Sequence, residues 1–235
     1  MKKAQKYFLL ALSIIVLDQI IKVIVKLNME LGEEIRVIGG LFKIHFIENN
    51  GAAFGLTIAS LVNGLGLNMS EETGKLILSL FSIGAVVAIG VVLYRLAEHR
   101  SPLPYFVAMI FGGAVGNIID RTFYGVFFSK INYYEGGLFH GRVVDMFYLD
   151  IWKGRLPEWM PLVGGDYTSL WPIFNIADSA ISIGIVIILI FQSRFFRMDE
   201  KARTAETQHT GSSATPPLAT DTATAVEVPE TDPLT

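Results

Sequence analysis

The chain has 235 residues, of which 51% are hydrophobic and 17% charged, and its formal net charge is −3. The apolar residues come in blocks, which indicates a membrane protein rather than an ordinary soluble domain, and a slightly negative chain offers no basic field to nucleic acid. The lack of cysteine excludes disulfides, thiolate metal sites and a cysteine nucleophile. Four scattered histidines lack the spacing of a zinc site, so we expect no metal and no other cofactor.

Four apolar segments are long enough to cross a bilayer, which takes about 20 helical residues. They cover residues 7–25, 76–96, 103–119 and 173–195. No small-residue cleavage site follows the first segment and polar residues interrupt it, so we expect a retained helix rather than a secretory signal. The sequence predicts an all-α membrane protein with four transmembrane helices, built on residues 1–198.

Lysine and arginine cluster before the first segment, between the second and third, and at or beyond the end of the fourth. An even number of spans places these clusters on one face, which the positive-inside rule makes cytoplasmic together with both termini. The loops 27–74 and 120–172 then face outward. The clusters comprise Lys2, Lys3, Lys6, Arg95, Arg100, Arg194, Arg197, Lys201 and Arg203.

The first outer loop alternates apolar and polar residues over 41–47, which predicts a strand of a small sheet on the outer surface. Residues 63–74 are polar and contain glycine, which is typical of a loop. The second outer loop is rich in aromatic rings, which either anchor it at the membrane interface or contact a substrate. They include Phe123, Tyr124, Phe127, Phe128, Tyr133, Tyr134, Phe139, Phe147, Tyr148, Trp152, Trp159 and Trp171.

After Met198 the composition changes to Thr, Ala, Ser, Pro and Glu, without aromatic residues. Such a segment cannot bury enough apolar surface to fold. We therefore expect residues 199–235 to form a disordered cytoplasmic tail.

Polar residues inside the apolar segments are costly and need an explanation. Asp18 and Lys22 are four residues apart and can pair on one helix face, which is at least a structural ion pair. The third segment ends with a GxxxG pair, which permits close helix packing. Asn117 and Asp120 follow on one face of that helix, and Asp120 with Arg121 is by itself typical of a structural pair at the interface.

Asp145 lies in the second outer loop and Asp178 opens the fourth segment, so both can reach the outer membrane surface. Each alone fits a local cap or ion pair. Two carboxylates about 3 Å apart share one proton, so the ionised member can activate water while the protonated member donates to the carbonyl of an amide. Contact between the two is a prediction, since the sequence places them only in one plane.

Five motifs in order resemble lipoprotein signal peptidase (signal peptidase II). They are Asp18-Gln19-x-x-Lys22, Asn49-x-Gly51-Ala52-Ala53-Phe54, Gly112-Gly113-Ala114-x-Gly116-Asn117-x-x-Asp120-Arg121, Val143-Val144-Asp145 and Phe174-Asn175-x-Ala177-Asp178-Ser179. The resemblance covers about residues 7–195. Met146, where the family usually has Phe, and Asn50, where Thr is common, depart from the pattern.

The resemblance implies an aspartic endopeptidase of the bacterial inner membrane. Such an enzyme removes the signal peptide of a diacylglyceryl-modified prolipoprotein just before the lipidated cysteine, and it carries a small outer β-cradle that the strand at 41–47 fits. Asp145 and Asp178 match the catalytic dyad. Asp18, Asn49, Asn117, Asp120, Arg121 and Asn175 match supporting positions, among which Asn117 and Arg121 are expected to hold substrate and Asp120 to be structural. Besides the substrate we expect membrane lipids as partners, and a monomer.

Two other classes of function stay open at this stage. A small ion-coupled transporter would use Asp18, Asp120 and Asp178 as a relay across the membrane depth, although no internal repeat is visible in the chain. A membrane scaffold without activity would keep Asp145 and Asp178 apart or salt-bridged. The position of these two aspartates distinguishes the three hypotheses.

Overall fold

The computed structural model describes residues 2–51, 57–151, 153–155, 167–169 and 172–212. The chain divides into two compact units, Met1–Asp199 and Glu200–Thr235. The first unit contains the predicted membrane segments and every candidate site residue. The motif residues Ala52, Ala53 and Phe54, and Trp152, Trp159 and Trp171, lie outside the described residues.

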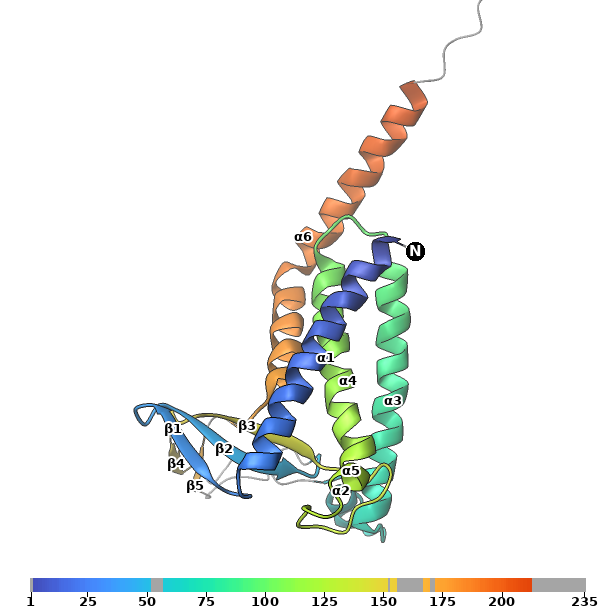
Figure 1. Ribbon diagram of the computed structural model, residues 1–235. Coiled ribbons are helices and arrows are strands. Elements are labelled where there is room, and N and C mark those ends of the chain that lie inside the picture. Colours follow the sequence, from blue (N-terminus) through green and yellow to red (C-terminus); the bar gives the residue numbers. More distant parts are fainter. Residues whose placement is uncertain (1, 52–56, 152, 156–166, 170–171, 213–235) are drawn as a thin grey trace, which may run out of the picture. The chain divides into compact units, whose positions relative to one another are not determined.

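Four long helices form the body of the first unit, where they run side by side (Figure 1). They are α1 (Lys2–Asn28), α3 (Glu71–Leu96), α4 (Leu103–Ile119) and α6 (Ile176–Ser212). Within the described residues, four helical stretches are long and apolar enough to cross a membrane: Ala4–Asn28, Glu71–Leu96, Leu103–Phe127 and Ile176–Lys201. The predicted four-helix membrane fold is confirmed.

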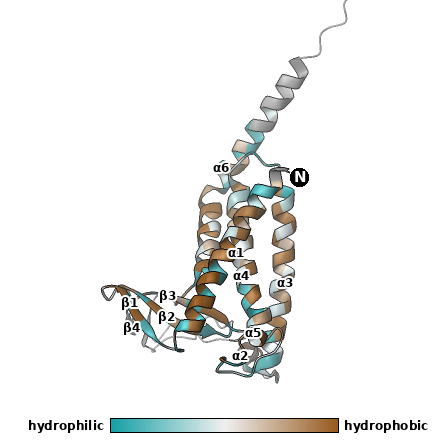
Figure 2. Ribbon diagram, viewed as in Figure 1, coloured by the Kyte–Doolittle hydropathy of each residue, from teal (hydrophilic) through white to brown (hydrophobic). Residues whose placement is uncertain are grey.

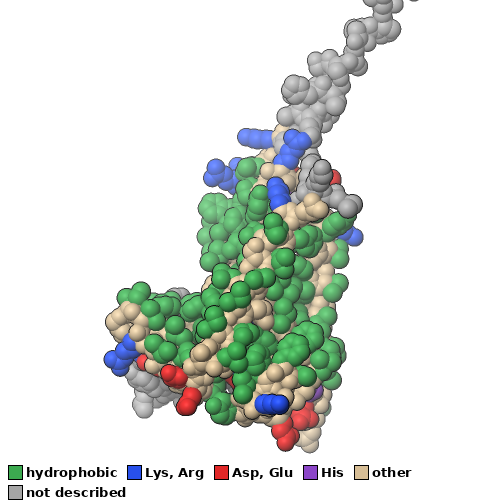
Figure 3. Space-filling model, viewed as in Figure 1, with side chains coloured by type: hydrophobic (Ala, Val, Ile, Leu, Met, Phe, Trp, Pro, Cys, Tyr) green, Lys and Arg blue, Asp and Glu red, His purple; other side chains and the backbone are tan. Residues whose placement is uncertain are grey.

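Large apolar side chains remain exposed along these helices, as Figures 2 and 3 show. Phe81 is 75% exposed, Ile190 66% and Leu9 63%. In water such a surface would drive aggregation, whereas lipid tails cover it at no cost. The exposed apolar belt therefore agrees with a membrane location.

The glycines of α4 bring the helices into backbone contact, as the GxxxG pair predicts. A Cβ on Gly112 would lie 2.8 Å from the carbonyl oxygen of Ala11 in α1, and one on Gly113 would lie 2.4 Å from that of Ala177 in α6. A Cβ on Gly116 would lie 2.7 Å from Oδ2 of Asp18. These approaches set α1 and the start of α6 directly against α4.

The helix of α4 continues beyond residue 119, where the predicted span ends. It passes into a π-helical turn, η1 (Asp120–Tyr124), and a short helix, α5 (Gly125–Phe127). Widened turns of this kind are frequent at functional sites. The turn contains the polar pair Asp120–Arg121.

A three-stranded antiparallel sheet follows the order β1 (Glu34–Ile38), β2 (Phe42–Asn49), β3 (Val143–Leu149). It lies at the end of the bundle where α1 ends and α6 begins (Figure 1). The strand expected at 41–47 is confirmed as β2. β3 lies in a segment that the sequence predicts to be a loop, so that prediction is wrong there. The first four residues of β3 are all buried, so it lacks the alternation of apolar and polar residues that indicates a strand.

Other parts of the outer loops also differ from the prediction. A short helix, α2 (Ile58–Gly64), and the start of α3 occupy parts of the expected loop 63–74, and Ser70 caps α3 by accepting from the backbone N–H of Thr73. The second loop contains a two-stranded sheet of β4 (Lys153–Arg155) and β5 (Tyr167–Ser169). Not all its aromatic rings face outward, since Tyr124 and Tyr148 are buried.

Two buried clusters form the core of the first unit. One joins the helices near the start of α1 and contains Tyr7, Leu93, Val107 and Phe195. The other joins the end of α1 to the sheet and contains Val25, Phe46, Tyr124, Val144 and Met146. In the second unit α6 continues to Ser212, and the rest of the expected tail, 213–235, lies outside the described residues, so its disorder stays a prediction.

Candidate active site

Asn175 and Asp178 form the first turn of α6. Asn175 directly precedes the helix, and its Oδ1 accepts from the backbone N–H of Asp178 at 2.8 Å. In return, Oδ2 of Asp178 accepts from the backbone N–H of Asn175 at 3.4 Å. This reciprocal pair is a capping box built from Asn and Asp. The cap fixes the direction of the Asp178 carboxylate before any substrate arrives.

The amide of Asn175 also reaches Asp145 on β3. Its Nδ2 donates to Oδ1 of Asp145 at 2.6 Å, and Asn175 is fully buried. The two aspartates, 33 positions apart in the sequence, therefore both contact one asparagine. The convergence that the sequence could not establish comes from β3, which pairs with β2 while Phe147 forms a bridge to Phe174, just before α6.

Asp145 is 1% exposed and lies opposite Ile47 in the register of β2 and β3. Its Oδ2 accepts from Nδ2 of Asn49 at 3.2 Å. Burial, and to a smaller extent the charge of Asp178, raise the pKa of Asp145 from 3.8 to about 7, although hydrogen bonds from Asn49 and Asn175 and the charge of Lys22 oppose the shift. Asp145 is thus poised to hold a proton near neutral pH.

Asn117 on α4 holds the other carboxylate. Its Nδ2 donates to Oδ1 of Asp178 at 2.8 Å. Its Oδ1 accepts from Nδ2 of Asn175 at 3.2 Å and from Nζ of Lys22 at 2.9 Å. These three bonds fix the orientation of the Asn117 amide, and they link the aspartates to the buried ion pairs behind them.

Lys22 is the centre of those ion pairs. It is fully buried, and its Nζ lies 2.8 Å from Oδ2 of Asp18 and 2.9 Å from Oδ2 of Asp120. The pair of Asp18 and Lys22 is present as the spacing predicts. Asp120 pairs with Lys22, which the sequence did not indicate, because the partner lies on another helix.

Both acids of this cluster also bind backbone groups that position the site. Oδ1 of Asp18 accepts from the N–H of Ala177 at 2.9 Å, in the first turn of α6. Oδ2 of Asp120 accepts from the N–H of Val144 at 3.2 Å, next to Asp145. The ion pairs of Lys22 therefore hold the segments that carry the two converging aspartates.

Sequence reasoning missed two members of this cluster. Gln19 donates from Nε2 to Oδ1 of Asp120 at 2.8 Å and to the carbonyl of Gly116 at 3.2 Å. Tyr124 donates its hydroxyl to Oε1 of Gln19 at 3.0 Å. The signal for Gln19 was its place between Asp18 and Lys22, whereas nothing in the sequence singled out Tyr124 among the aromatic residues.

Arg121 lies at the open side of the site. Its Nη1 donates to Oγ of Ser82 on α3 at 3.0 Å, and its Nη2 lies beside Gly51, which has a positive φ of 84°. Nε of Arg121 is buried and has no hydrogen-bond partner within the described residues. This N–H is a donor with spare capacity.

The side chain of the remaining supporting residue, Asn49, is held by a hydrogen bond within the turn that follows it. Its Oδ1 accepts from the N–H of Gly51 at 2.8 Å, while its Nδ2 binds Asp145. All eight residues singled out from the sequence thus belong to one connected region of the structure. Among the described residues, no three His, Asp or Glu side chains are grouped as a metal ion would require.

The chain matches the family model "Signal peptidase (SPase) II" over residues 10–194. It is 40% identical to the lipoprotein signal peptidase of Porphyromonas gingivalis over 202 residues, which cover 79% of this chain and 81% of the relative. It is 34% identical to that of Amoebophilus asiaticus, covering 80% and 78%. A solved bacterial membrane enzyme, determined by the in meso method, is 26% identical with a TM-score of 0.50, covering 81% of this chain and 88% of the solved one.

Proposed function

Since the chain belongs to the signal peptidase II family of bacterial membrane peptidases, we propose that it is an aspartic endopeptidase whose catalytic dyad is Asp145 and Asp178. The observation that carries this proposal is their shared partner: Asn175 binds Asp145 through its side chain and Asp178 through both its side chain and its backbone. Two carboxylates about 3 Å apart share a proton, and contact between Asp145 and Asp178 is part of this proposal.

The proton belongs on Asp145. That residue is 1% exposed and its pKa is raised to about 7, chiefly by burial. Asp178 is half-buried and accepts two N–H bonds, from Asn117 and Asn175, which fix the position of its carboxyl group. Asp178 is therefore the general base and Asp145 the general acid.

The reaction follows from these two states. Water attacks the carbonyl carbon of the scissile amide, Asp178 takes a proton from that water, and Asp145 gives its proton to the carbonyl oxygen. Collapse of the tetrahedral intermediate returns a proton from the new hydroxyl to Asp145. At the same time Asp178 protonates the leaving nitrogen, so both aspartates end as they began. The water oxygen then remains in the new carboxyl group, and the proton that Asp178 took from the water is on the leaving amine.

Arg121 is the group we assign to substrate. Its buried Nε lacks a partner, and a carbonyl oxygen of an extended peptide is a suitable acceptor. Asn117 was expected to hold substrate as well. Because all three of its bonds go to Lys22, Asp178 and Asn175, we assign it instead to positioning the base.

We assign the substrate class from the relatives, which are named lipoprotein signal peptidases. The substrate is a prolipoprotein whose diacylglyceryl-modified cysteine follows the scissile bond. An active site between the helix ends and the sheet suits such a substrate, because the acyl chains stay in lipid beside the exposed apolar helices while the peptide reaches the aspartates. No cysteine of the enzyme competes with that of the substrate.

We place the site at the outer membrane face, with both termini in the cytoplasm. Lysine and arginine side chains gather at the end of the bundle where α1 begins (Figure 3), which supports this orientation. The acids of the site converge at the other end rather than being spaced across the membrane depth. That arrangement favours the peptidase over the ion-coupled transporter.

The test is cleavage of a synthetic diacylglyceryl-modified precursor by the purified protein and by its Asp145→Asn and Asp178→Asn variants. Each variant should lose activity by at least about 10³-fold, because its dyad lacks either the acid or the base. Asp150→Asn is the matched control, since Asp150 lies just after the same strand but binds Lys43. Normal cleavage by either dyad variant would refute the assignment.

A further inference from the structure

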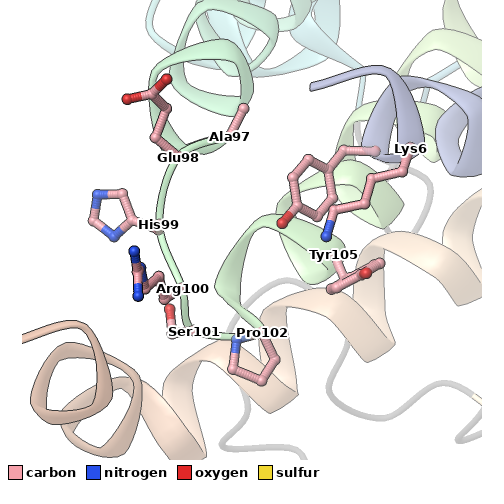
Figure 4. Close-up of a pocket in the computed structure, with 9 residues that line it drawn as sticks. Lys6, Ala97, Glu98, His99, Arg100, Ser101, Pro102 and Tyr105 are labelled. Carbon is pink, nitrogen blue, oxygen red and sulfur yellow. The ribbon is translucent and has the colours of Figure 1, made fainter. Parts of the chain in front are cut away.

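A second polar cavity lies at the opposite end of the bundle from the aspartates. It has a volume of about 580 Å³ and lies between the start of α1, the start of α4 and the connection from α3 to α4. Figure 4 shows Lys6 and Tyr105 on one side of it, His99 and Arg100 on the other, and Ser101 with Pro102 between them. The peptidase reaction assigns no task to this cavity.

Two cations face the cavity from separate elements. Nζ of Lys6 lies 4.8 Å from the ring centroid of Tyr7 and 5.1 Å from that of Tyr105, so both rings hold the ammonium in place. The connection is held by Asp199, which accepts from the backbone N–H of Arg100 at 3.2 Å and lies 3.3 Å from Nδ1 of His99.

The one carboxylate that lines the cavity does not oppose an anion there. Glu98 is exposed, and Figure 4 shows its carboxylate directed away from Lys6. Lys6 and Arg100 are the lysine and arginine among the residues that line the cavity.

Ser101 supplies the observation that indicates a ligand. It is only 3% exposed, it lines the cavity, and its hydroxyl has no hydrogen-bond partner within the described part of the chain. A buried hydroxyl without a partner is costly. Next to it, α4 begins at Leu103 after Pro102, and no side chain caps that helix end. An uncapped helix N-terminus attracts anions.

The donors therefore suit a phosphate group: one ammonium, one guanidinium, a free hydroxyl and a helix N-terminus. A separate apolar groove on α1 and α3 would take the rest of the ligand. It has a volume of about 380 Å³ and is formed mainly by apolar side chains of α1 and α3. It is lined by Ala4, Gln5, Phe8, Leu9, Leu12 and Tyr94.

The groove begins in the same turns of α1 that carry Lys6 and Tyr7 and extends along the helix to Leu12. An acyl chain would cover its apolar wall, which a free phosphate ion would leave bare. The combination of a phosphate-binding cavity and an adjacent apolar groove at the end of a membrane helix is the shape of a phospholipid.

We propose that this cavity binds the phosphate headgroup of an anionic phospholipid, with one acyl chain along the groove between α1 and α3. Lys6 and Arg100 contribute charge, and Ser101 donates the hydrogen bond that it lacks in the free protein. The site is separate from the aspartates and does not depend on the peptidase assignment.

The experiment is native mass spectrometry of the full-length protein in an uncharged detergent, with phosphatidylglycerol or phosphatidylcholine of identical acyl chains. The double variant Lys6→Gln/Arg100→Gln removes both cations. Its matched control, Arg194→Gln/Arg197→Gln, removes two exposed charges of α6 that do not line the cavity. Thermal unfolding of each variant without lipid checks that it folds.

We expect the protein to retain phosphatidylglycerol in preference to phosphatidylcholine. The cavity double variant should bind phosphatidylglycerol about tenfold less tightly or worse, and the control should stay within about twofold. Ser101→Ala separates ligand binding from packing: it should weaken lipid binding while raising the unfolding temperature of the lipid-free protein, because it removes an unsatisfied buried hydroxyl.

Three results would overturn the proposal. Equal losses in the cavity variant and the control would mean attraction by surface charge alone. Equal retention of the two lipids would mean that no headgroup site exists. Displacement of phosphatidylglycerol by inorganic phosphate at a comparable concentration would mean a site for the free anion instead.

Discussion

The substitution Lys22→Met tests whether buried charge positions the catalytic aspartates. Lys22 is fully buried and binds Asp18 at 2.8 Å and Asp120 at 2.9 Å, both of which are buried as well. Met is of similar length and keeps the apolar stem, so the change removes charge and hydrogen bonds with little change in volume. It leaves two carboxylates of like charge inside the bundle without a cation.

Breaking a buried ion pair by removing one partner typically costs 3–5 kcal/mol, roughly, because the remaining charge is uncompensated. Here one cation serves two acids, so we expect a loss at the upper end, about 5 kcal/mol. Much of it should return when the acids are neutralised. In the triple variant Lys22→Met/Asp18→Asn/Asp120→Asn the amides keep acceptors for the N–H groups of Ala177 and Val144.

The assay is reversible unfolding in mixed detergent micelles, followed by circular dichroism, with lipoprotein cleavage measured in parallel. Lys22→Met should lose activity along with stability, since Asp18 and Asp120 position the backbone next to Asp178 and Asp145. A loss below about 1 kcal/mol, the range of an exposed pair, would refute the view that the cluster is buried and holds the site. So would a triple variant no more stable than the single one.

Three further predictions concern protonation, packing and the outer partners of the cluster. The folded-state pKa of Asp145 is raised from 3.8 to about 7, so its proton stabilises the folded protein below about pH 4, and this contribution is lost as the pH rises through about 7. The value of kcat/KM should fall over the upper part of this range. Asp145→Asn should flatten the dependence of the free energy of unfolding on pH. Gly116→Ala should destabilise the protein, since its Cβ would lie 2.7 Å from Oδ2 of Asp18. Gly84→Ala, with nothing within 4 Å of its Cβ, should stabilise it by about 0.5–1 kcal/mol. If both variants shifted the unfolding temperature in the same direction, this account of the packing would be contradicted. Tyr124→Phe should cost about 1 kcal/mol through the bond to Gln19, and no change in unfolding would show that this bond contributes nothing.

The helical part of the fold could be predicted because each span has to be long and apolar to cross lipid. The sheet could be predicted only where apolar and polar residues alternate along a strand, as in β2. β3 could not, since its residues 143–146 are all buried and do not alternate between apolar and polar side chains. The sequence also does not predict the π-helical turn, because a widened turn depends on tertiary contacts rather than on the helix propensity of its residues.

The candidate site was predictable as a set of residues but not as a network. Spacing along one helix reveals the pair of Asp18 and Lys22, because i and i+4 share a face. It cannot reveal that Lys22 also binds Asp120 in η1, or that Asn175 joins β3 to α6, since those contacts depend on how the helices pack. Gly112, Gly113 and Gly116 set that packing, and the GxxxG spacing of Gly112 and Gly116 was its one indication in the sequence.

The four acids of the site differ in the kind of partner that they bind, and this difference separates a structural role from a chemical one. Asp18 and Asp120 share the ammonium of Lys22, whose charge binds both carboxylates as structural ion pairs. Asp145 and Asp178 accept hydrogen bonds from the amides of Asn49, Asn117 and Asn175, which orient a carboxylate without supplying positive charge.

A neutral amide lets the protonation state of its partner change during a reaction, whereas an ammonium opposes it. A site that must take a proton from water and return it therefore needs amides in contact with the reacting acids and can place the cation only one step behind them. Lys22 occupies that position, since it contacts Asn117 and not the carboxylate that Asn117 holds. By this reasoning Asn117→Asp, which sets a further negative charge against Asp178, should impair catalysis more than Asn117→Ala, and the reverse order of cleavage rates would contradict it.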